Sequence, residues 1–222
     1  KANSHDIENI FAAIVKVSRQ VQRRSTQRPA KAGEDRGITR IAVMGSRGSF
    51  SEQAGHAYAK KAHIKKYELS YPVSAEGVLN ELETRQADIG IFPIHNSAGG
   101  IVIESIYAAS EHQFFIEDLF EMDIRQCLLA APGATKQTIT RIMSHHQALA
   151  QCRGYITQHF PEAQLIEASD TATAAEFLSK HKAKNIGVIA PAQCAKLYGL
   201  KLLQEGIQDQ KFNLTKFIAA RL

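Results

Sequence analysis

Residues 141–160, RIMSHHQALAQCRGYITQHF, join a short apolar strand to an amphipathic helix. The strand ends at Met143, and Ser144 is the predicted N-cap of the helix, with Gln147 three residues later as its capping-box partner. The residues that then recur at helical spacing are Leu149, Cys152, Tyr155 and Ile156. A strand-to-helix turn directs free backbone N–H groups at the space above it, which suits a carboxylate or a phosphate. We therefore expect Ser144 and Gln151 to border a binding site, although an ordinary capped helix would give the same local pattern.

The composition indicates one α/β domain or two small lobes with a hydrophobic core. The chain has 222 residues, of which 44% are hydrophobic and 22% are charged. No apolar run reaches the roughly 18 residues of a membrane helix, and no signal-peptide pattern opens the chain, so we expect a cytoplasmic protein without membrane contact. The net charge of +5 would permit nucleic-acid binding, but much of the excess lies in the first forty residues. No alternation of basic and aromatic residues follows, and we expect an anionic small molecule and no nucleic acid.

The cysteines and histidines give no metal pattern. Cys127, Cys152 and Cys194 are odd in number and widely separated, without the CxxC spacing of a structural zinc site. We expect reduced, mostly buried thiols. His145 and His146 are adjacent in sequence, whereas ligands on a helix are usually four residues apart.

The first 37 residues are predicted to be a helix and a linker. Residues 5–24 place apolar side chains on one helical face, with acidic residues early and basic residues late. Residues 25–37 contain no apolar residue larger than alanine, one proline and two glycines. We expect this helix to pack against another chain or against the surface of a lobe.

From Ile38 onward, strand and helix patterns alternate to the last residue. We predict a first, parallel lobe over about 38–115 plus the C-terminal strand, and a second lobe over about 120–208. The segments that cross between the lobes, near 114–121 and 208–213, are the predicted hinges.

The loops that end the strands have a shared composition of glycine, serine, threonine and asparagine. They are residues 45–51, 95–100, 144 and 170–173. Ligands of open α/β sheets bind beyond the carboxyl ends of the strands, so these loops predict a pocket for a compact polyanion between two lobes. No Walker lysine follows the first loop, and its Gly45-x-x-Gly48 spacing is not GxGxxG, which disfavours a nucleotide.

Five motifs, in order, make residues 38–222 resemble the prephenate dehydratase domain. They are GSRGSFSEQAG at 45–55, PIHNS at 93–97, SHHQALAQC at 144–152, DTATAA at 170–175, and Asp209 followed by NLTKF at 213–217. The segment IENIFAAIVKVSRQVQ at 7–22 also resembles the last helix of the chorismate mutase domain that is often fused in front. Only five residues follow Phe217, so we expect the phenylalanine-sensing ACT domain of such fused enzymes to be absent.

The resemblance implies a fold, a reaction and a set of site residues. The fold would be α/β, with two lobes like a type II periplasmic binding protein, preceded here by the N-terminal helix. The reaction would convert prephenate to phenylpyruvate in phenylalanine biosynthesis without a cofactor or a metal, commonly in a homodimer. The threonine of the last motif, Thr215, would be the proton donor to the departing hydroxyl. The other implied catalytic residues are His95, Asn96 and Gln151. The implied substrate-binding residues are Ser49, Ser97, Ser144, Thr171, Ala172, Lys216 and Phe217.

Five residues depart from the family pattern. His95 replaces a glutamate, Lys216 an arginine, Ser49 a threonine, and Ser46-Arg47 a Pro-Glu pair. Lysine keeps the charge of arginine but loses its bidentate fork, and a histidine beside an anionic substrate can be neutral or positive where a glutamate is negative. Three functions therefore remain open: a prephenate dehydratase, a prephenate decarboxylase that keeps the hydroxyl, and a module that binds prephenate or a related dicarboxylate without turnover.

Overall fold

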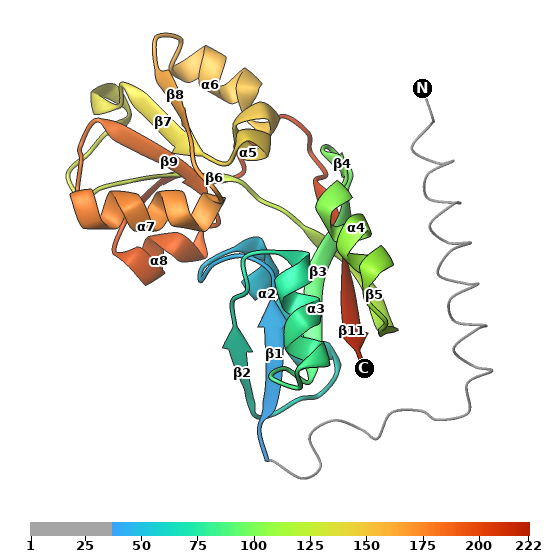
Figure 1. Cartoon of the computed structure of the whole chain (residues 1–222). Helices are drawn as coiled ribbons and strands as arrows, with labels where there is room; N and C mark the ends of the chain where they lie inside the picture. Colours follow the sequence, from blue (N-terminus) through green and yellow to red (C-terminus); the bar gives the residue numbers. More distant parts are fainter. Residues whose placement is uncertain (1–36) are drawn as a thin grey trace, which may run out of the picture.

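The computed structural model describes residues 37–222, which form two α/β lobes, each built around one sheet (Figure 1). The predicted N-terminal helix and nearly all of its linker lie outside the described residues. Lobe 1 holds the six-stranded sheet, and lobe 2 holds the five-stranded sheet. No described helix is long and apolar enough to span a membrane.

The sheet of lobe 1 has the order β2-β1-β3-β11-β5, with β4 paired to β3. Its strands are β1 (Thr39–Val43), β2 (Tyr67–Ser70), β3 (Ile89–Asn96), β4 (Gly100–Ile101), β5 (Phe115–Asp123) and β11 (Leu214–Arg221). The predicted parallel arrangement holds for β1, β2 and β3, but β11 is antiparallel to both β3 and β5, so the sheet is mixed. The strand furthest along the chain therefore lies inside lobe 1, between strands that precede it by about ninety residues or more.

Helices cover both faces of this sheet. They are α2 (Phe50–Lys61), α3 (Ala75–Glu83) and α4 (Ile103–Glu111). The small and aromatic residues of α2 pack with Phe217 on one face, and α3 packs with Ile218 on the other face. Because Phe217 and Ile218 are consecutive, β11 contributes to both cores by the alternation of a strand.

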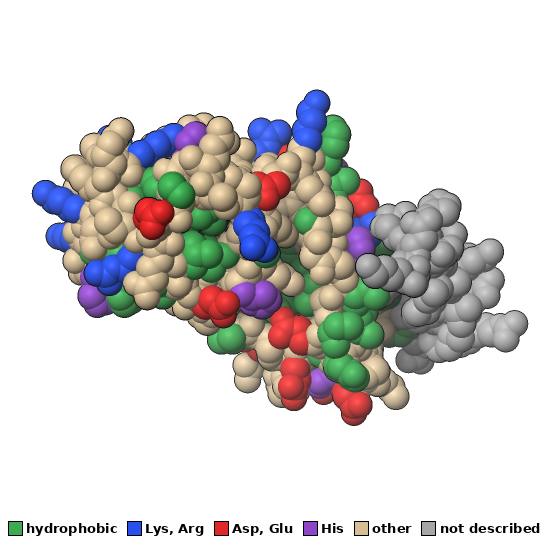
Figure 2. All heavy atoms as spheres, turned by 90° about the horizontal axis from the view of Figure 1, so that it is seen from above, with side chains coloured by type: hydrophobic (Ala, Val, Ile, Leu, Met, Phe, Trp, Pro, Cys, Tyr) green, Lys and Arg blue, Asp and Glu red, His purple; other side chains and the backbone are tan. Residues whose placement is uncertain are grey.

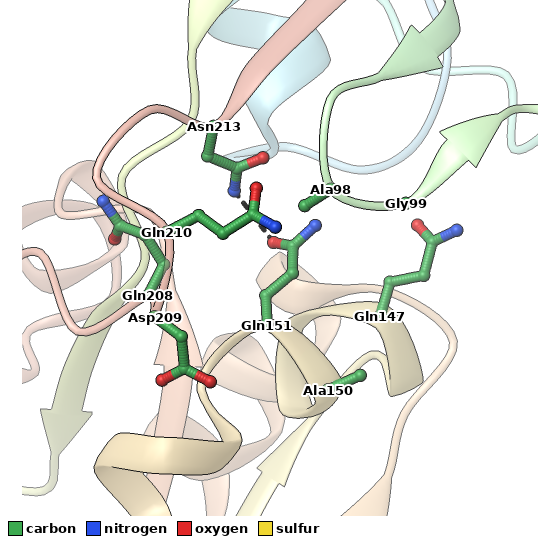
Figure 3. A pocket seen from close by; sticks show the side chains of 9 residues that line it. All are labelled: Ala98, Gly99, Gln147, Ala150, Gln151, Gln208, Asp209, Gln210 and Asn213. Atoms are coloured by element: carbon green, nitrogen blue, oxygen red, sulfur yellow. Dashed lines mark hydrogen bonds between the residues drawn. The ribbon is translucent and has the colours of Figure 1, made fainter. Parts of the chain in front are cut away.

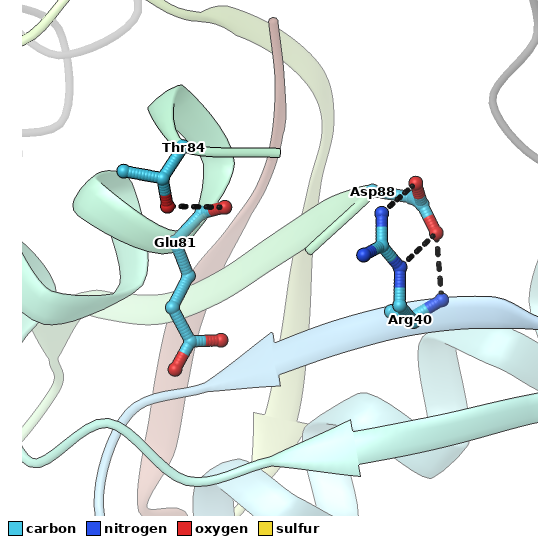
Figure 4. Close-up of polar contacts among 4 residues, drawn as sticks. All are labelled: Arg40, Glu81, Thr84 and Asp88. Atoms are coloured by element: carbon cyan, nitrogen blue, oxygen red, sulfur yellow. Dashed lines mark hydrogen bonds and ion pairs between the residues drawn. The ribbon is translucent and has the colours of Figure 1, made fainter. Parts of the chain in front are cut away.

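An ion pair fixes the end of lobe 1 that is remote from lobe 2 (Figure 4). Arg40 Nη2 lies 2.9 Å from Asp88 Oδ1, and the backbone N–H of Arg40 donates to Asp88 Oδ2 at 2.8 Å. In the same region Thr84, at the end of α3, donates its hydroxyl to the carbonyl of Asn80 at 2.7 Å. The Arg40–Asp88 bonds hold the start of β1 beside the residue that precedes β3, and the other ends of both strands are directed toward lobe 2 (Figure 1).

The sheet of lobe 2 has the order β10-β6-β9-β7-β8. Its strands are β6 (Cys127–Ala130), β7 (Arg141–Ser144), β8 (Gln164–Glu167), β9 (Ile186–Ala190) and β10 (Lys201–Gln204). Its helices are the 3₁₀ turn η1 (Lys136–Thr138), α5 (His146–Gln151), α6 (Arg153–His159), α7 (Thr171–His181) and α8 (Gln193–Tyr198). Helices α7 and α8 cover one face, and α5 and α6 cover the other. The three cysteines are free and buried in these two cores, as predicted.

The turn from β7 into α5 differs from the prediction. Ser144 is the last residue of β7, where it pairs with Glu167, and its fully buried hydroxyl donates to the carbonyl of Ile189 at 2.6 Å. The N-cap is instead His145, whose Nδ1 accepts the N–H of Gln147. The prediction of Ser144 as N-cap was wrong because pairing with β8 continues through that residue.

The predicted single helix after this turn is divided into α5 and α6. The break lies at Cys152, whose φ of −110° and ψ of 17° are not helical. Asp209 explains the new start, because its carboxylate accepts the N–H groups of Gly154 and Tyr155 in the first turn of α6. A side chain 55 residues away in sequence therefore caps α6.

Two segments connect the lobes, residues 124–126 between β5 and β6, and residues 205–213 between β10 and β11. They are hydrogen-bonded to each other through Ile207 N to Gln126 O at 2.9 Å and Ile124 N to Asn213 O at 2.7 Å. The predicted crossing at 114–121 was wrong, since those residues pair with β11 inside the sheet. The predicted crossing at 208–213 lies in the second connection.

Candidate active site

Three side-chain amides form a closed hydrogen-bonded ring between the lobes. Asn96, at the end of β3, donates from Nδ2 to Asn213 Oδ1 at 2.7 Å. Asn213 donates from Nδ2 to Gln151 Oε1 at 2.9 Å, and Gln151, at the end of α5, donates from Nε2 to Asn96 Oδ1 at 3.2 Å. We call these three residues the amide ring. Two belong to lobe 1 or its connection, and Gln151 belongs to lobe 2.

Thr215 lies against the amide ring. Its Oγ1 is 2.8 Å from Asn96 Nδ2, and the residue is only 7% exposed. β3 and β11 bring the two residues together, because Thr215 is the register partner of Asn96 in the antiparallel pair. Since the amide nitrogen can only donate, Thr215 Oγ1 is an acceptor in this bond. Within the described residues, no side chain or carbonyl accepts the Thr215 hydroxyl proton.

Ser97 joins the end of β3, which carries Asn96, to the start of β11, which carries Thr215. Its hydroxyl accepts the N–H of Leu214 at 2.9 Å, and its own N–H donates to the Leu214 carbonyl at 2.8 Å. The predicted site residue Ser97 therefore contacts the backbone of Leu214, which lies between Asn213 and Thr215 in the sequence. Its position fixes the spacing between β3 and the start of β11.

A pocket of about 210 Å³ opens beside the amide ring (Figure 3). Its lining residues are Ala98, Gly99, Gln147, Ala150, Gln151, Gln208, Asp209, Gln210 and Asn213. Five of them carry side-chain amides, Asp209 carries a carboxylate, and none carries a cationic side chain. Such a lining offers neutral N–H donors beside one carboxylate, whose oxygens already accept backbone N–H groups of α6.

A second contact between the lobes lies at the loop after β1. Ser46 donates its hydroxyl to both oxygens of Asp170 at 2.9 Å, and Asp170 is the N-cap of α7. Buried Glu52 accepts from the N–H of Gly48 at 2.6 Å, from the Tyr71 hydroxyl at 2.6 Å and from an amide of lobe 2 at 3.2 Å. We call residues 46–52, with their lobe 2 partners Asp170, Gln193, Cys194 and Tyr198, the clasp.

Backbone carbonyls supply most of the clasp in lobe 1. The carbonyls of residues 47, 48 and 49 accept from Tyr198 Oη at 2.7 Å, Cys194 Sγ at 3.3 Å and Gln193 Nε2 at 3.2 Å, respectively. Burial raises the pKa of Cys194 and of Tyr198 to about 12, so both stay protonated donors at neutral pH. Gly48 has φ of +91°, and a Cβ there would stand 2.9 Å from Cys194 Sγ, so only glycine fits this approach.

His145 lies near Asp170 of the clasp, whose charge acts on it. Burial lowers its pKa, and the charge of neighbouring His146 lowers it further, against the opposite effects of Asp170 and Glu167. The two imidazole rings are 4.1 Å apart. A neutral His145 agrees with its role as N-cap, which requires an unprotonated Nδ1.

Basic side chains are dispersed on one face of the two lobes (Figure 2). On the face seen in Figure 2, Lys and Arg side chains are scattered among acidic and polar ones and form no continuous basic area. Within residues 37–222, no group of His, Cys, Asp and Glu side chains has the arrangement of a metal site.

Residues 41–221 match the family model described as prephenate dehydratase. The chain belongs to the prephenate dehydratase family. Arogenate dehydratase 1 of Petunia hybrida is 35% identical over 182 residues, which are 81% of this chain and 41% of that protein. The bifunctional chorismate mutase/prephenate dehydratase of Stutzerimonas stutzeri is 33% identical over 180 residues, which are 81% of this chain and 47% of that protein. The chain thus spans less than half the length of these relatives.

A solved member of the family has the same fold. The crystal structure of prephenate dehydratase from Arthrobacter aurescens in complex with L-Phe superposes with a TM-score of 0.75 at 28% identity, over 82% of this chain and 60% of that chain. The two-lobed α/β fold of a prephenate dehydratase, as predicted from the motifs, is confirmed.

The prephenate dehydratase motifs supply residues to both inter-lobe contacts. Asn96, Gln151 and Thr215 meet at the amide ring. Ser49 is the N-cap of α2, where its Oγ accepts the N–H of Glu52, and its carbonyl belongs to the clasp. Thr171 begins α7 directly after Asp170 of the clasp, and the next residue, Ala172, is fully buried in the core of lobe 2.

Two residues of the last motif lie away from the amide ring. Lys216 Nζ is 3.4 Å from Glu121 Oε1 and borders a separate hollow with Phe120. Phe217 is buried in the core and stacks on Phe120 at 5.8 Å. His95 is buried and is the register partner of Lys216. Consecutive residues on a strand face opposite sides, so Thr215 and Lys216 serve different surfaces.

Asn213 and Gln126 were not predicted as site residues. Asn213 closes the amide ring, and buried Gln126 donates from Nε2 to Gln151 Oε1 at 3.2 Å. For Asn213 a signal existed, because it is the first residue of the NLTKF motif. Gln126 lies in no motif, and only the path of the first connection brings it to the ring.

Proposed function

We propose that the chain converts prephenate to phenylpyruvate, carbon dioxide and water, with Thr215 as the general acid. Family membership supports the reaction. The single observation that carries the assignment of the acid is the bond from Asn96 Nδ2 to Thr215 Oγ1, which leaves the hydroxyl proton of a nearly buried threonine unused.

The chemistry requires one proton donor and a weakly held carboxylate. The bond from the ring carboxylate to the ring breaks to release carbon dioxide, its electron pair enters the ring, and the bond to the ring hydroxyl breaks. That hydroxyl takes the Thr215 proton and leaves as water, and Thr215 recovers a proton from solvent. As the proton leaves, the N–H of Asn96 stabilises the developing charge on Oγ1. Aromatisation supplies the driving force, so the proposed reaction uses no cofactor.

The amide lining of the pocket supports this requirement. A cation bound to the departing carboxylate would stabilise the charge that must flow into the ring, and binding of this kind raises the barrier. Gln147, Gln151 and Gln210 offer neutral donors instead. We propose that the pocket holds a carboxylate of the substrate through these amides, with Ser49, Ser97 and Thr171 as further binding or orienting groups.

Product analysis with purified protein tests the proposal. Prephenate and arogenate are supplied separately, because relatives of similar identity include an arogenate dehydratase. Phenylpyruvate from prephenate supports the proposed function, whereas faster formation of phenylalanine from arogenate would make arogenate the substrate of the same site. A non-aromatic dihydro acid would identify a decarboxylase. Unchanged substrate with saturable binding would identify a binding module.

We propose further that the functional unit is a cytoplasmic homodimer. The bifunctional relative carries a chorismate mutase, and the predicted N-terminal helix would be the end of such a domain in this chain. Light scattering on the full chain and on a chain without residues 1–36 tests the assembly, and prephenate binding should survive the truncation.

A further inference from the structure

We infer that Asn213 is a positioning residue, which accepts one hydrogen of the Asn96 amide and so holds the other against Thr215 Oγ1. The inference rests on the proposed function, since it assigns Asn213 a part in the same proton transfer. Asn213 is fully buried and contacts Asn96 on one side and Gln151 on the other.

The orientation of the amide ring is fixed by backbone groups. Asn96 Oδ1 accepts the N–H of Ala98 at 3.0 Å and the N–H of Gly99 at 2.7 Å. A backbone N–H can only donate, so the Asn96 amide cannot be reversed. Its Nδ2 must therefore face Asn213 and Thr215, and Asn213 must present its oxygen to Asn96 and its nitrogen to Gln151.

This orientation decides what Thr215 can do. Thr215 Oγ1 and Asn213 Oδ1 lie 2.8 and 2.7 Å from the same nitrogen, Asn96 Nδ2, and each accepts one of its two hydrogens. The bond to Asn213 therefore holds the second hydrogen of Asn96 against Thr215 Oγ1, while three donors fix Asn96 Oδ1. Because Oγ1 accepts this bond, the Thr215 proton is directed away from Asn96 and stays available to the substrate. Gln151 comes from lobe 2, so the ring is complete only when the lobes are together.

Two variants of Asn213 distinguish positioning from simple packing. Asn213→Ala removes both bonds and should lower kcat roughly 10- to 100-fold, with a smaller change in KM. Asn213→Asp keeps the shape but reproduces the asparagine bonds only when protonated, with C=O toward Asn96 and O–H toward Gln151. The ionised form would repel Gln151 Oε1, and its negative charge would oppose the charge that develops on Thr215 Oγ1. The kcat of this variant relative to wild type should therefore rise as pH falls, about tenfold per pH unit above the pKa of the introduced carboxyl.

The matched control is Asn185→Asp, at a lobe 2 asparagine that contacts Thr140 and lies in neither inter-lobe contact. Its kcat should follow wild type at every pH. A ratio for Asn213→Asp that does not change with pH, or a wild-type kcat in Asn213→Ala, would overturn the inference.

Urea unfolding of the same variants tests the ring without turnover. Burial should raise the pKa of the carboxyl introduced by Asn213→Asp above its unfolded value of about 3.9. The variant should then lose stability relative to Asn213→Ala as pH rises through that folded pKa. If wild type converts neither prephenate nor arogenate, the proposed function fails, and the pH dependence of stability then tests the hydrogen bonds of Asn213 without turnover. A stability difference between the two variants that does not change with pH would contradict those bonds.

Discussion

The amide ring and the clasp both join lobe 1 to lobe 2, but they are built from different parts of the chain. The ring uses neutral side chains on both sides, namely Asn96, Asn213 and Gln151. The clasp uses three backbone carbonyls of lobe 1 together with two carboxylates, Glu52 and Asp170.

Three of the departures from the family pattern, Ser46, Arg47 and Ser49, lie in the clasp. Arg47 contributes only its carbonyl there, whereas Ser46 contributes a hydroxyl that a proline does not have. In the ring every bond needs a particular donor or acceptor on a side chain, and there the family residues are retained. Substitutions at the ring should therefore alter the rate, and substitutions at the clasp should alter the affinity.

The largest effect is expected at Thr215. Thr215→Val keeps the shape but removes the hydroxyl, and it should lower kcat by a factor of roughly 100 to 10,000, the scale of general acid catalysis, with little change in substrate affinity. Thr215→Ser keeps the hydroxyl and should retain partial activity. Steady-state kinetics on prephenate measures both. Equal turnover in Thr215→Val and wild type would place the acid elsewhere.

A smaller effect is expected at the clasp. Ser46→Ala removes both contacts to Asp170 while Asp170 still caps α7 through Thr173. The closed arrangement should be less populated, so KM should rise about 3- to 10-fold and kcat should stay within about 2-fold. Small-angle scattering should show compaction of wild type by substrate, and the variant should need more substrate for the same compaction. A scattering profile of wild type that saturating substrate leaves unchanged would contradict a closing cleft.

The smallest effect is expected at His95. His95→Glu restores the family residue beside Lys216, its register partner, at a position that is buried. Burial of the carboxylate opposes the attraction between the two charges, so the free energy of unfolding, measured by urea unfolding, should change by less than about 1 kcal/mol. We expect a change in kcat below about 3-fold, because the side chain lies on the sheet face of Lys216. A larger change in kcat would show that position 95 takes part in the reaction.

Much of this molecule could be predicted from the sequence because short patterns carry the information. Alternation of strands and helices gave the two lobes, and five motifs gave Thr215, Asn96 and Gln151. The amide ring could not be predicted, because its members come from segments 55, 62 and 117 residues apart. The prediction of Ser144 as a helix N-cap was wrong for a related reason. Whether a serine caps a helix or ends a strand depends on a neighbouring strand that local pattern does not include.

The order of strands in lobe 1 has a consequence for synthesis on the ribosome. Lobe 2 is contiguous from β6 to β10, so it can fold as soon as Gln204 has left the exit tunnel. Lobe 1 cannot, because β11 fills the gap between β3 and β5. Until Arg221 emerges, β3 has an unpaired edge and β5 has no partner strand in the sheet, and unpaired strand edges can pair with other chains. The strand that covers both edges is the one that brings Thr215.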